Sequence, residues 1–303
     1  MQSDTLFFIT PSADHLRRGL EALQAKIGAW EPFRFADGER GYHLGSPVKG
    51  ELVAVVGSVT PDPGSLFDII ALTDLLSENG AQRPILILPY LGYARQDRPV
   101  HAGDGRLGVV VANLLRDLKP ARIVVLDVHS PGVRAALGAV AVEASAIELF
   151  VRHLMSSAAI DTVVAPDRGA RERTRMIAAR FTPNAKVAEI EKTRPRANLA
   201  RAIRLEGDVA GRHVLIIDDM IDTGGTLCEA VRLVVSGGAA SVRVAATHGI
   251  FSEGARERVL SLPVDQIIVT NSLRQAEHPR IEVLDVVPIL LAGLEQFMRD
   301  RNL

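Results

Sequence analysis

Residues 213–227 read His-Val-Leu-Ile-Ile-Asp-Asp-Met-Ile-Asp-Thr-Gly-Gly-Thr-Leu, and the rest of the chain is organised around this stretch. Residues 214–217 form an unbroken apolar run, which is typical of a strand buried on both faces of a parallel sheet. Asp218 and Asp219 follow at the carboxyl end of that strand, where open α/β sheets bind ligands. The stretch therefore predicts an α/β fold with a ligand site at this strand end.

A short polar loop follows the acidic pair and leads into a helical pattern over residues 227–234. It consists of Asp222, Thr223, Gly224, Gly225 and Thr226. Consecutive glycines let several backbone N–H groups converge on one anion, and the start of a helix adds its positive dipole end. The loop therefore suits a phosphate group.

The acidic pair suits a different part of the same ligand. Asp218 and Asp219 cannot hold the phosphate, but their carboxylates can accept hydrogen bonds from hydroxyls or hold a metal ion. A phosphate loop beside two carboxylates indicates a phosphorylated polyol such as a sugar phosphate. The plainer interpretation is a strand cap followed by a turn that starts a helix.

The run as a whole resembles the phosphoribosyl-diphosphate-binding signature shared by type I phosphoribosyltransferases and ribose-phosphate pyrophosphokinases. The resemblance implies that the acidic pair accepts the ribose 2- and 3-hydroxyls and that the loop binds the 5-phosphate. The residues assigned to ribose 5-phosphate are then Asp218, Asp219, Asp222, Thr223, Gly224, Gly225 and Thr226.

A second stretch with ligand chemistry, residues 89–98, follows the apolar run at residues 85–88. It reads Pro-Tyr-Leu-Gly-Tyr-Ala-Arg-Gln-Asp-Arg. Aromatic rings can pack against a base, Gln and Asp can bond its edge, and Arg can pair with phosphate oxygens, so the mixture suits a nucleotide. Taken alone, Arg-Gln-Asp-Arg is equally compatible with a solvated loop.

This stretch resembles the ATP-binding segment of ribose-phosphate pyrophosphokinases, which simple phosphoribosyltransferases lack. In that family an upstream Phe-x-x-Gly-Glu stretch also contacts ATP, often from a neighbouring subunit, and residues 33–40 match it here. The residues that the resemblance assigns to ATP are Phe35, Asp37, Glu39, Arg95, Gln96 and Asp97.

Two further polar residues follow apolar runs and are candidates for a metal site. His129 follows the run at residues 123–126, and Asp167 follows the run at residues 162–165. A lone histidine there is more often structural, and an aspartate can simply cap a helix. The resemblance instead implies a Mg²⁺ site that includes both, and it also offers Asp167 as a ribose-side acid. His129 would supply one ligand at most or act through water, because Mg²⁺ prefers oxygen donors.

Residues 192–204 carry five basic side chains and no acid, between two expected strands. Such a segment is usually a solvated hairpin, but opposite a phosphate site it could close over a transferring phosphoryl group. The family motif is Lys-Arg-Arg-Pro-Arg-Ala-Asn, from which this chain departs at Thr193. The resemblance assigns the catalytic basic residues to Lys192 and Arg194, both retained.

Composition and length bound the domain organisation. A chain of 303 residues with 47% hydrophobic content can bury two cores. We expect an α/β protein with two similar phosphoribosyltransferase-type domains, each a mostly parallel sheet flanked by helices. Residues 1–142 would bind ATP and residues 143–303 the phosphoribosyl group, and the last helix could pack back on the first domain.

Charge and cysteine content exclude several classes of partner. The formal net charge of −1 gives no field that favours nucleic acid or a membrane. Cys228 is the only cysteine, so no intrachain disulfide forms. The amino terminus has only four consecutive apolar residues and no basic region, so we expect no signal peptide and a cytoplasmic protein.

The sequence therefore predicts a Mg²⁺-dependent ribose-phosphate diphosphokinase. It would transfer the β,γ-diphosphoryl group of ATP to the anomeric hydroxyl of ribose 5-phosphate, giving 5-phospho-α-D-ribose 1-diphosphate and AMP. The resemblance also implies a homo-oligomer built from dimers, with a hexamer among its forms. The alternatives are a phosphoribosyltransferase and a non-catalytic regulatory homologue, whereas a P-loop kinase is excluded because Gly-x-x-x-x-Gly-Lys-Ser/Thr is absent from the chain.

Overall fold

The structure is a computed structural model that describes residues 5–157, 159–181, 185–193 and 202–300. The chain forms two compact units, which we describe separately. Unit 1 comprises Met1–Ser145, Ser272–Arg274 and Asp285–Leu303, and unit 2 comprises Ala146–Asn271 and Gln275–Leu284. The carboxyl-terminal helix thus belongs to unit 1.

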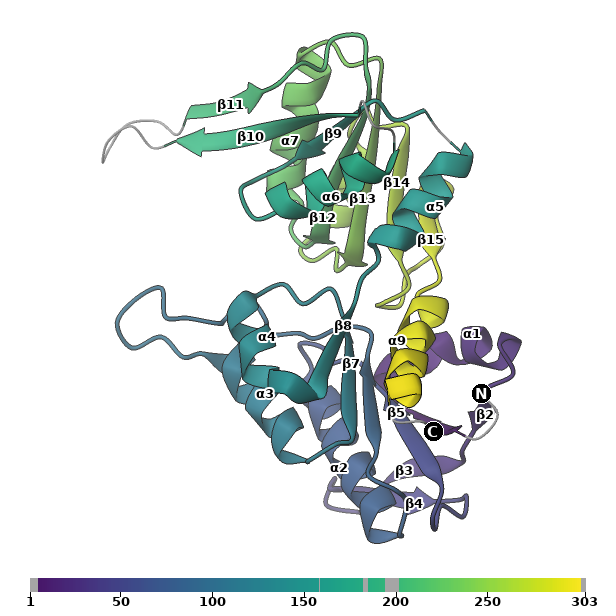
Figure 1. The fold of residues 1–303 in the computed structure, drawn as a ribbon. Helices are drawn as coiled ribbons and strands as arrows, with labels where there is room; N and C mark the ends of the chain where they lie inside the picture. The colour runs from purple at the N-terminus through teal and green to yellow at the C-terminus, as the bar shows by residue number, and fades with distance from the viewer. Residues whose placement is uncertain (1–4, 158, 182–184, 194–201, 301–303) are drawn as a thin grey trace. The chain divides into compact units, whose positions relative to one another are not determined.

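Unit 1 is built on a parallel sheet in the order β2-β1-β5-β6-β7-β8 (Figure 1). The strands are β1 (Thr5–Ile9), β2 (Lys26–Ile27), β5 (Leu52–Val56), β6 (Ile85–Leu88), β7 (Arg122–Leu126) and β8 (Ala141–Ala144). The apolar runs of the four central strands, β1, β5, β6 and β7, are buried on both faces, as parallel strands between helical layers require. The interior of this unit is therefore a helix–sheet–helix sandwich.

The helices of unit 1 cover both faces of that sheet. One core contains side chains of α2 (Pro63–Glu78), α3 (Leu107–Asp117) and α4 (Pro131–Leu137). On the other face lie η2 (Pro11–Leu16), α1 (Arg17–Ala22) and α9 (Val287–Asp300), while the short η3 (Gly138–Val140) leads into β8. A separate antiparallel hairpin, β3 (Trp30–Arg34) and β4 (Arg40–Leu44), packs on α2.

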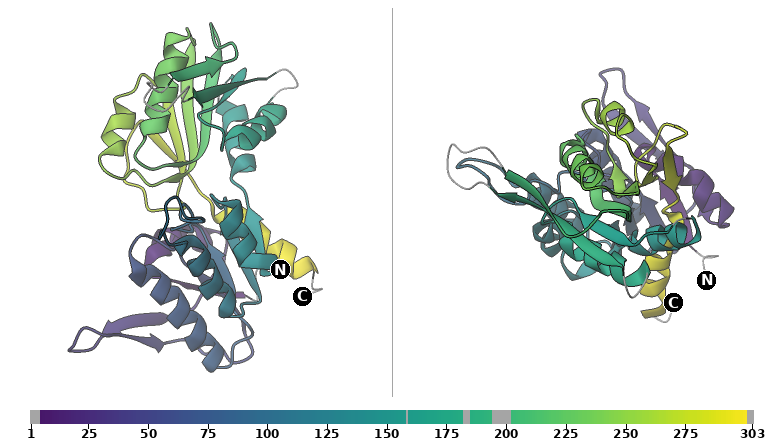
Figure 2. Two further views of the ribbon diagram at one scale, coloured as in Figure 1. Left: turned by 90° about the vertical axis from the view of Figure 1, so that its left-hand side faces the viewer. Right: turned by 90° about the horizontal axis from the view of Figure 1, so that it is seen from above.

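Unit 2 repeats the pattern with the strand order β11-β10-β9-β12-β13-β14-β15. The strands are β9 (Thr162–Ala165), β10 (Lys186–Thr193), β11 (Ala202–Glu206), β12 (His213–Ile221), β13 (Ser241–Gly249), β14 (Gln266–Thr270) and β15 (Ile281–Leu284). Pairing is parallel except between β10 and β11, which form a hairpin that extends beyond the other strands (Figures 1 and 2). β12 lies in the middle of this sheet, between β9 and β13.

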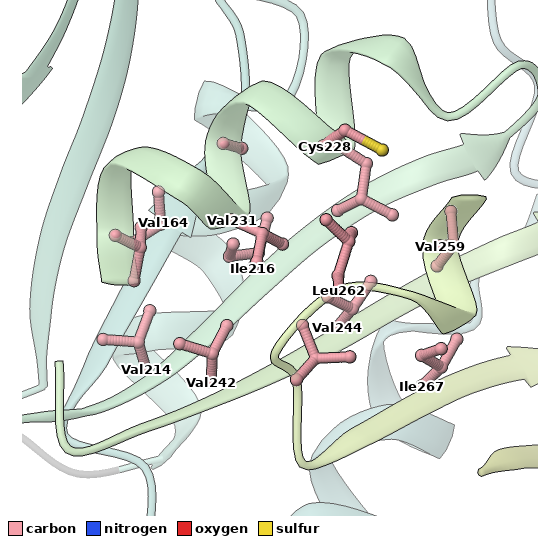
Figure 3. Close-up of a cluster of buried hydrophobic side chains, with 14 of the residues drawn as sticks. Val164, Val214, Ile216, Cys228, Val231, Val242, Val244, Val259, Leu262 and Ile267 are labelled. Atoms are coloured by element: carbon pink, nitrogen blue, oxygen red, sulfur yellow. The ribbon is translucent and has the colours of Figure 1, made fainter. Parts of the chain in front are cut away.

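The core of unit 2 explains why residues 213–227 organise this half of the chain. α7 (Gly225–Ser236) and α8 (Ala255–Leu260) cover one face of the sheet, and α6 (Arg171–Phe181) packs on β9 and β10, with α5 (Ile147–Ser157) beside it. Figure 3 shows Cys228 and Val231 of α7 gathered with Val214 and Ile216 of β12. Each fully buried aliphatic side chain contributes about 1.5–3 kcal/mol of hydrophobic free energy.

The predicted fold class, two α/β units that each contain a mostly parallel sheet flanked by helices, is confirmed. Among the described residues, no helix combines the length and the apolar character needed to cross a membrane. After α1, Gln24 takes a left-handed backbone (φ 61°), and Lys26–Ile27 pairs with β1 as the edge strand of unit 1.

One expectation needs correction. The buried strand does not end before the acidic pair: β12 continues through Asp218 and Asp219 to Ile221, because β13 extends to Gly249 and pairs with Asp218, Met220 and Ile221. The two ends of the basic segment at residues 192–204 lie in the β10–β11 hairpin, where the backbone of Lys192 pairs with Ile203, and residues 194–201 lie outside the described residues.

Candidate functional site

The acidic pair lies on the last part of β12, at the carboxyl end of the sheet of unit 2. The Asp218 carboxylate accepts a hydrogen bond from the Asp219 N–H at 2.9 Å. Burial of this carboxyl raises the pKa of Asp218 well above its usual range, and the negative charges of Asp219 and Asp167 raise it further. A ligand that offers hydroxyl donors or a cation here would offset the cost of crowding these charges.

Asp167 approaches the acidic pair from the turn between β9 and α6. One of its carboxylate oxygens accepts hydrogen bonds from the N–H groups of Gly169 (2.8 Å) and Ala170 (3.2 Å), so the residue closes the turn before α6, which begins at Arg171, and is not the helix cap itself. Its effect on the pKa of Asp218 shows that the two carboxyls are close enough to interact. The predicted metal residue Asp167 thus lies near the predicted ribose residues.

The phosphate loop joins β12 to α7 with the backbone that an anion site requires. Gly224 is left-handed (φ 76°), and a Cβ at this position would lie 3.0 Å from Val259 Cγ2, so glycine is favoured twice over. α7 begins at Gly225, and the Gly224 carbonyl accepts the Cys228 N–H at 2.8 Å. The N–H groups at the start of this helix have no carbonyl partner within it, which favours an anion there.

One of the two candidate catalytic residues, Lys192, lies on β10. Lys192 is the penultimate residue of that strand, whereas Arg194 lies outside the described residues. Arg171, the first residue of α6, binds two carboxylates of β10: its Nε lies 2.6 Å from Glu189 and its Nη2 lies 2.7 Å from Glu191. These ion pairs fasten the strand that carries Lys192 to the helix that follows Asp167.

In unit 1 the predicted ATP residue Asp97 contacts the segment that carries His129. The Ser130 hydroxyl donates a 2.6 Å hydrogen bond to the Asp97 carboxylate, and its oxygen also accepts the Gly132 N–H at the start of α4. This hydroxyl, together with the nearby charges of Arg98 and His129, lowers the pKa of Asp97. The structure therefore brings two predicted binding segments together through a serine that the residue pattern had not singled out.

A helix signal in the sequence could have identified Ser130. Serine followed by proline is a typical start of a helix, with the serine as N-cap and the proline in the first turn. Arg95 and Gln96 on the neighbouring segment are exposed, as is His129, so all three can reach a ligand. Asp127, two residues before His129, is buried with a left-handed backbone (φ 38°) and accepts a hydrogen bond from the Ser145 hydroxyl.

The β3–β4 hairpin carries the other predicted ATP residues on its exposed face. Phe35 is 53% exposed, and its ring meets that of Phe33 edge to face, with ring centres 5.0 Å apart. Asp37 and Glu39 are also exposed, and the Asp37 carboxylate accepts the Glu39 N–H at 3.0 Å within the turn. Exposed aromatic rings beside carboxylates can stack on a nucleobase and accept bonds from its edge.

Both groups of predicted ATP residues are attached to the start of α2. On the hairpin, Arg40 Nη1 and the Tyr42 hydroxyl each donate a 2.7 Å hydrogen bond to Asp68 Oδ1. Beside the other segment, the Tyr93 hydroxyl donates to the Pro61 carbonyl at 3.0 Å. The two segments are therefore anchored to one stretch of chain, which runs from Pro61, just before α2, to Asp68 within it.

The described residues contain no group of three or more His, Cys, Asp or Glu side chains arranged to hold a metal ion. The two predicted metal residues lie in different units, His129 in unit 1 and Asp167 in unit 2. The carboxylate oxygens of Asp167, Asp218 and Asp219 are nevertheless the donor type that Mg²⁺ prefers, and this ion usually takes one or two carboxylates plus water and substrate phosphates.

Comparisons with known proteins cover nearly the whole chain. Residues 8–118 match the model of the N-terminal domain of ribose phosphate pyrophosphokinase, and residues 137–271 match the phosphoribosyl transferase domain. A ribose-phosphate pyrophosphokinase from Caldanaerobacter subterraneus subsp. tengcongensis is 31% identical over 95% of this chain and 89% of its own length. A protein of that name from Helicobacter hepaticus is 34% identical over 89% of this chain and 87% of its own length.

A comparison of the fold with solved structures indicates the same kind of protein. The crystal structure of phosphoribosylpyrophosphate synthetase from Mycobacterium smegmatis superposes with a TM-score of 0.88 and 29% sequence identity, covering 99% of both chains.

Proposed function

Because this chain belongs to the ribose-phosphate pyrophosphokinase family, we propose that it transfers the β,γ-diphosphoryl group of ATP to the anomeric hydroxyl of ribose 5-phosphate. The products are 5-phospho-α-D-ribose 1-diphosphate and AMP. The reaction is a phosphoryl transfer, so catalysis consists mostly of positioning and of electrostatic stabilisation of the transferring group.

One observation carries the sugar-phosphate half of this proposal: in unit 2 the phosphate loop directly follows the strand that carries the acidic pair. The loop from Asp222 to Thr226 presents glycine N–H groups at the start of a twelve-residue helix. Asp218 and Asp219 precede it on β12 and crowd negative charge that hydroxyl donors would offset. Ribose 5-phosphate has both complements, a 5-phosphate and a neighbouring diol.

The nucleotide half rests on unit 1. Arg95 and Gln96 are exposed beside Asp97, whose lowered pKa keeps its carboxylate charged and able to accept hydrogen bonds. The exposed ring of Phe35 offers a stacking surface, with Asp37 and Glu39 beside it. We assign these six residues to ATP, and we propose a homo-oligomer in which the hairpin of one chain serves the site of another.

Mg²⁺ fits the donor chemistry of the acidic residues. We assign Asp167 to the ion, with His129 as one ligand at most or a partner through water. When bound, Mg²⁺ neutralises charge on the diphosphoryl group. The Asp167 carboxylate is already oriented by the Gly169 and Ala170 N–H groups, so it needs no rearrangement to present an oxygen.

We assign the remaining charge neutralisation to Lys192 and Arg194. The Arg171 ion pairs to Glu189 and Glu191 support this assignment for Lys192, because they hold the second half of β10, which carries Lys192, against α6. No side chain is assigned as a general base. Binding of the sugar hydroxyl next to a cation would lower its pKa and reduce the need for one.

The direct experiment is an assay of the purified chain with ATP, ribose 5-phosphate and Mg²⁺, following AMP release. We expect AMP to form only when both substrates are present, and Lys192→Ala to lower turnover by orders of magnitude with little change in substrate affinity. A phosphoribosyltransferase would instead consume the diphosphate product with a nucleobase. A non-catalytic homologue would bind substrates without releasing AMP.

A further inference from the structure

The phosphate loop is held from outside by residues 250–258, which we call the supporting segment. Arg258 on α8 donates two hydrogen bonds to the Thr223 carbonyl, from Nη2 at 2.8 Å and from Nε at 3.3 Å. The Ser252 hydroxyl donates a short hydrogen bond to the Asp222 carboxylate. Two successive loop residues are therefore fastened to a segment about thirty positions later in the chain.

The contact with Thr223 fixes the direction of the next amide. A trans peptide is planar, with its C=O and N–H pointing in opposite directions. Because the Thr223 carbonyl is bound by Arg258, the Gly224 N–H of the same peptide must point away from Arg258. Gly224 is left-handed, so this amide is followed by the turn into α7 whose N–H groups suit an anion.

The supporting segment is itself constrained and can act as a fixed frame. Phe251 and Glu253 have left-handed backbones (φ 51° and 50°), which non-glycine residues adopt at an energetic cost. The N–H groups of Ile250 and Phe251 both donate to the Ile221 carbonyl at 2.9 Å, immediately before the loop. Such conformations persist only where surrounding contacts determine them, and they occur frequently at binding sites.

We propose that Arg258 and Ser252 are positioning residues for the sugar phosphate: they preset the peptide planes of the loop so that the Gly224 N–H is directed at the 5-phosphate. This inference rests on the proposed function, which identifies the ligand as ribose 5-phosphate. Neither residue needs to touch the ligand. Their effect is preorganisation, since a loop already in its bound conformation does not lose conformational entropy on binding.

The chain contains a matched control on the same helix. Arg256 also donates from its guanidinium to backbone carbonyls, those of Ala276 (2.7 Å) and Glu277 (3.3 Å), outside the phosphate loop. Arg256→Met and Arg258→Met therefore remove the same charge and the same kind of contact. Only the second variant releases the Thr223 carbonyl.

The first measurement is calorimetric titration of the full chain with ribose 5-phosphate. We expect Arg258→Met to weaken binding by roughly threefold to tenfold, the loss typical of one net hydrogen bond at an exposed position. Ser252→Ala should weaken binding to a similar extent, and Arg256→Met should stay within about twofold of wild type. Equal affinity of Arg258→Met and wild type, or equal losses in the two arginine variants, would overturn the proposal.

The second measurement needs no ligand, so it separates this inference from the proposed function. In Arg258→Met, amide hydrogen exchange should accelerate at residues 222–226 and remain as in wild type on β12. In Arg256→Met, exchange should remain as in wild type in both segments. If wild type fails to bind ribose 5-phosphate but this exchange pattern is found, the proposed function is wrong and the loop support stands. Unchanged exchange at residues 222–226 would refute the support itself.

Discussion

Replacing Asp68 by asparagine should loosen the β3–β4 hairpin that carries Phe35. Asp68 is only 6% exposed, and its Oδ1 accepts hydrogen bonds from Arg40 Nη1 and the Tyr42 hydroxyl, both at 2.7 Å. Asparagine keeps the shape and one carbonyl oxygen, but it removes the negative charge. The hairpin would then be attached by weaker, neutral hydrogen bonds.

The expected loss of free energy that holds the hairpin in place follows from the strength of these two hydrogen bonds and from the exposure of Arg40. Hydrogen bonds to a charged group contribute about 1.5–3 kcal/mol each and neutral ones about 0.5–1.5 kcal/mol. The Arg40 side chain is 28% exposed and also donates to the Gly64 carbonyl, so part of its interaction survives. We therefore expect a loss of about 2 kcal/mol, which corresponds to roughly a thirtyfold increase in the detached population of the hairpin.

Tyr42 gives a spectroscopic signature of the same change. Burial, reinforced by the hydrogen bond to Asp68 and its charge, raises the pKa of Tyr42 from 10.0 to about 12. Since the folded pKa is the higher one, this tyrosine stabilises the fold below about pH 10, and the contribution is lost as the pH rises through about 12. In Asp68→Asn the phenol should ionise at lower pH, which ultraviolet difference absorbance would detect.

Hydrogen exchange of β3 and β4 is the decisive assay, with Asp74→Asn as control. Asp74 lies on the same helix but is exposed, so its replacement should change nothing in the hairpin. We expect faster exchange in Asp68→Asn, together with a higher KM for ATP and an unchanged KM for ribose 5-phosphate. If the two variants exchanged at the same rate in β3 and β4, Asp68 would not be the anchor of the hairpin.

Three further predictions concern the other contacts. Ser130→Ala should raise the pKa of Asp97 towards its ordinary value, which carboxyl NMR titration would detect. As the pH falls, the stability contributed by ionised Asp97 would then be lost at a higher pH than in wild type. Loss of the helix cap should lower the free energy of unfolding in urea by about 1 kcal/mol. Arg171→Met should lower turnover more than Arg175→Met, measured by AMP release, because Arg171 alone spans Glu189 and Glu191. Asp218→Asn should raise the urea midpoint of the ligand-free protein at neutral pH while weakening ribose 5-phosphate binding, because a carboxyl with a raised pKa loses its stabilising contribution as the pH rises through that pKa.

Each of these three predictions has a contrary result. An unchanged carboxyl titration in Ser130→Ala would mean that the hydroxyl does not set the pKa of Asp97. Equal turnover in the Arg171 and Arg175 variants would show that the Arg171 ion pairs to β10 do not support catalysis. A lower urea midpoint for Asp218→Asn would show that the ionised carboxylate stabilises the empty site.

The fold, and the position of the acidic pair and the glycine loop between a buried strand and a helix, could be predicted because their signals are local. An apolar run marks each buried strand, and adjacent glycines before a helix mark an anion loop, since φ and hydrophobicity depend on the residues themselves. Gly224 takes the left-handed backbone (φ 76°) that glycine adopts without steric cost. The length of β12 was misjudged because strand ends depend on the neighbouring strand, here β13, which local sequence does not reveal.

The supporting contacts could not be predicted because they join residues far apart in the chain. Asp68 binds Tyr42 across 26 positions, Ser130 binds Asp97 across 33, and Arg258 binds Thr223 across 35. Each is a single side chain with no periodic pattern, and only the folded chain brings the partners together. The roles of Lys192, Arg194 and the ATP residues stay predictions, as do Mg²⁺ dependence, the oligomeric state and the cytoplasmic location.

The proposed reaction moves two phosphoryl groups together from ATP to the anomeric oxygen of ribose 5-phosphate. The most direct measurement is phosphorus NMR of the complete reaction with Mg²⁺, which distinguishes a diphosphate attached to the sugar from a single phosphate. We expect equal amounts of AMP and 5-phospho-α-D-ribose 1-diphosphate. Formation of ADP and a sugar bisphosphate, or no transfer at all, would contradict it.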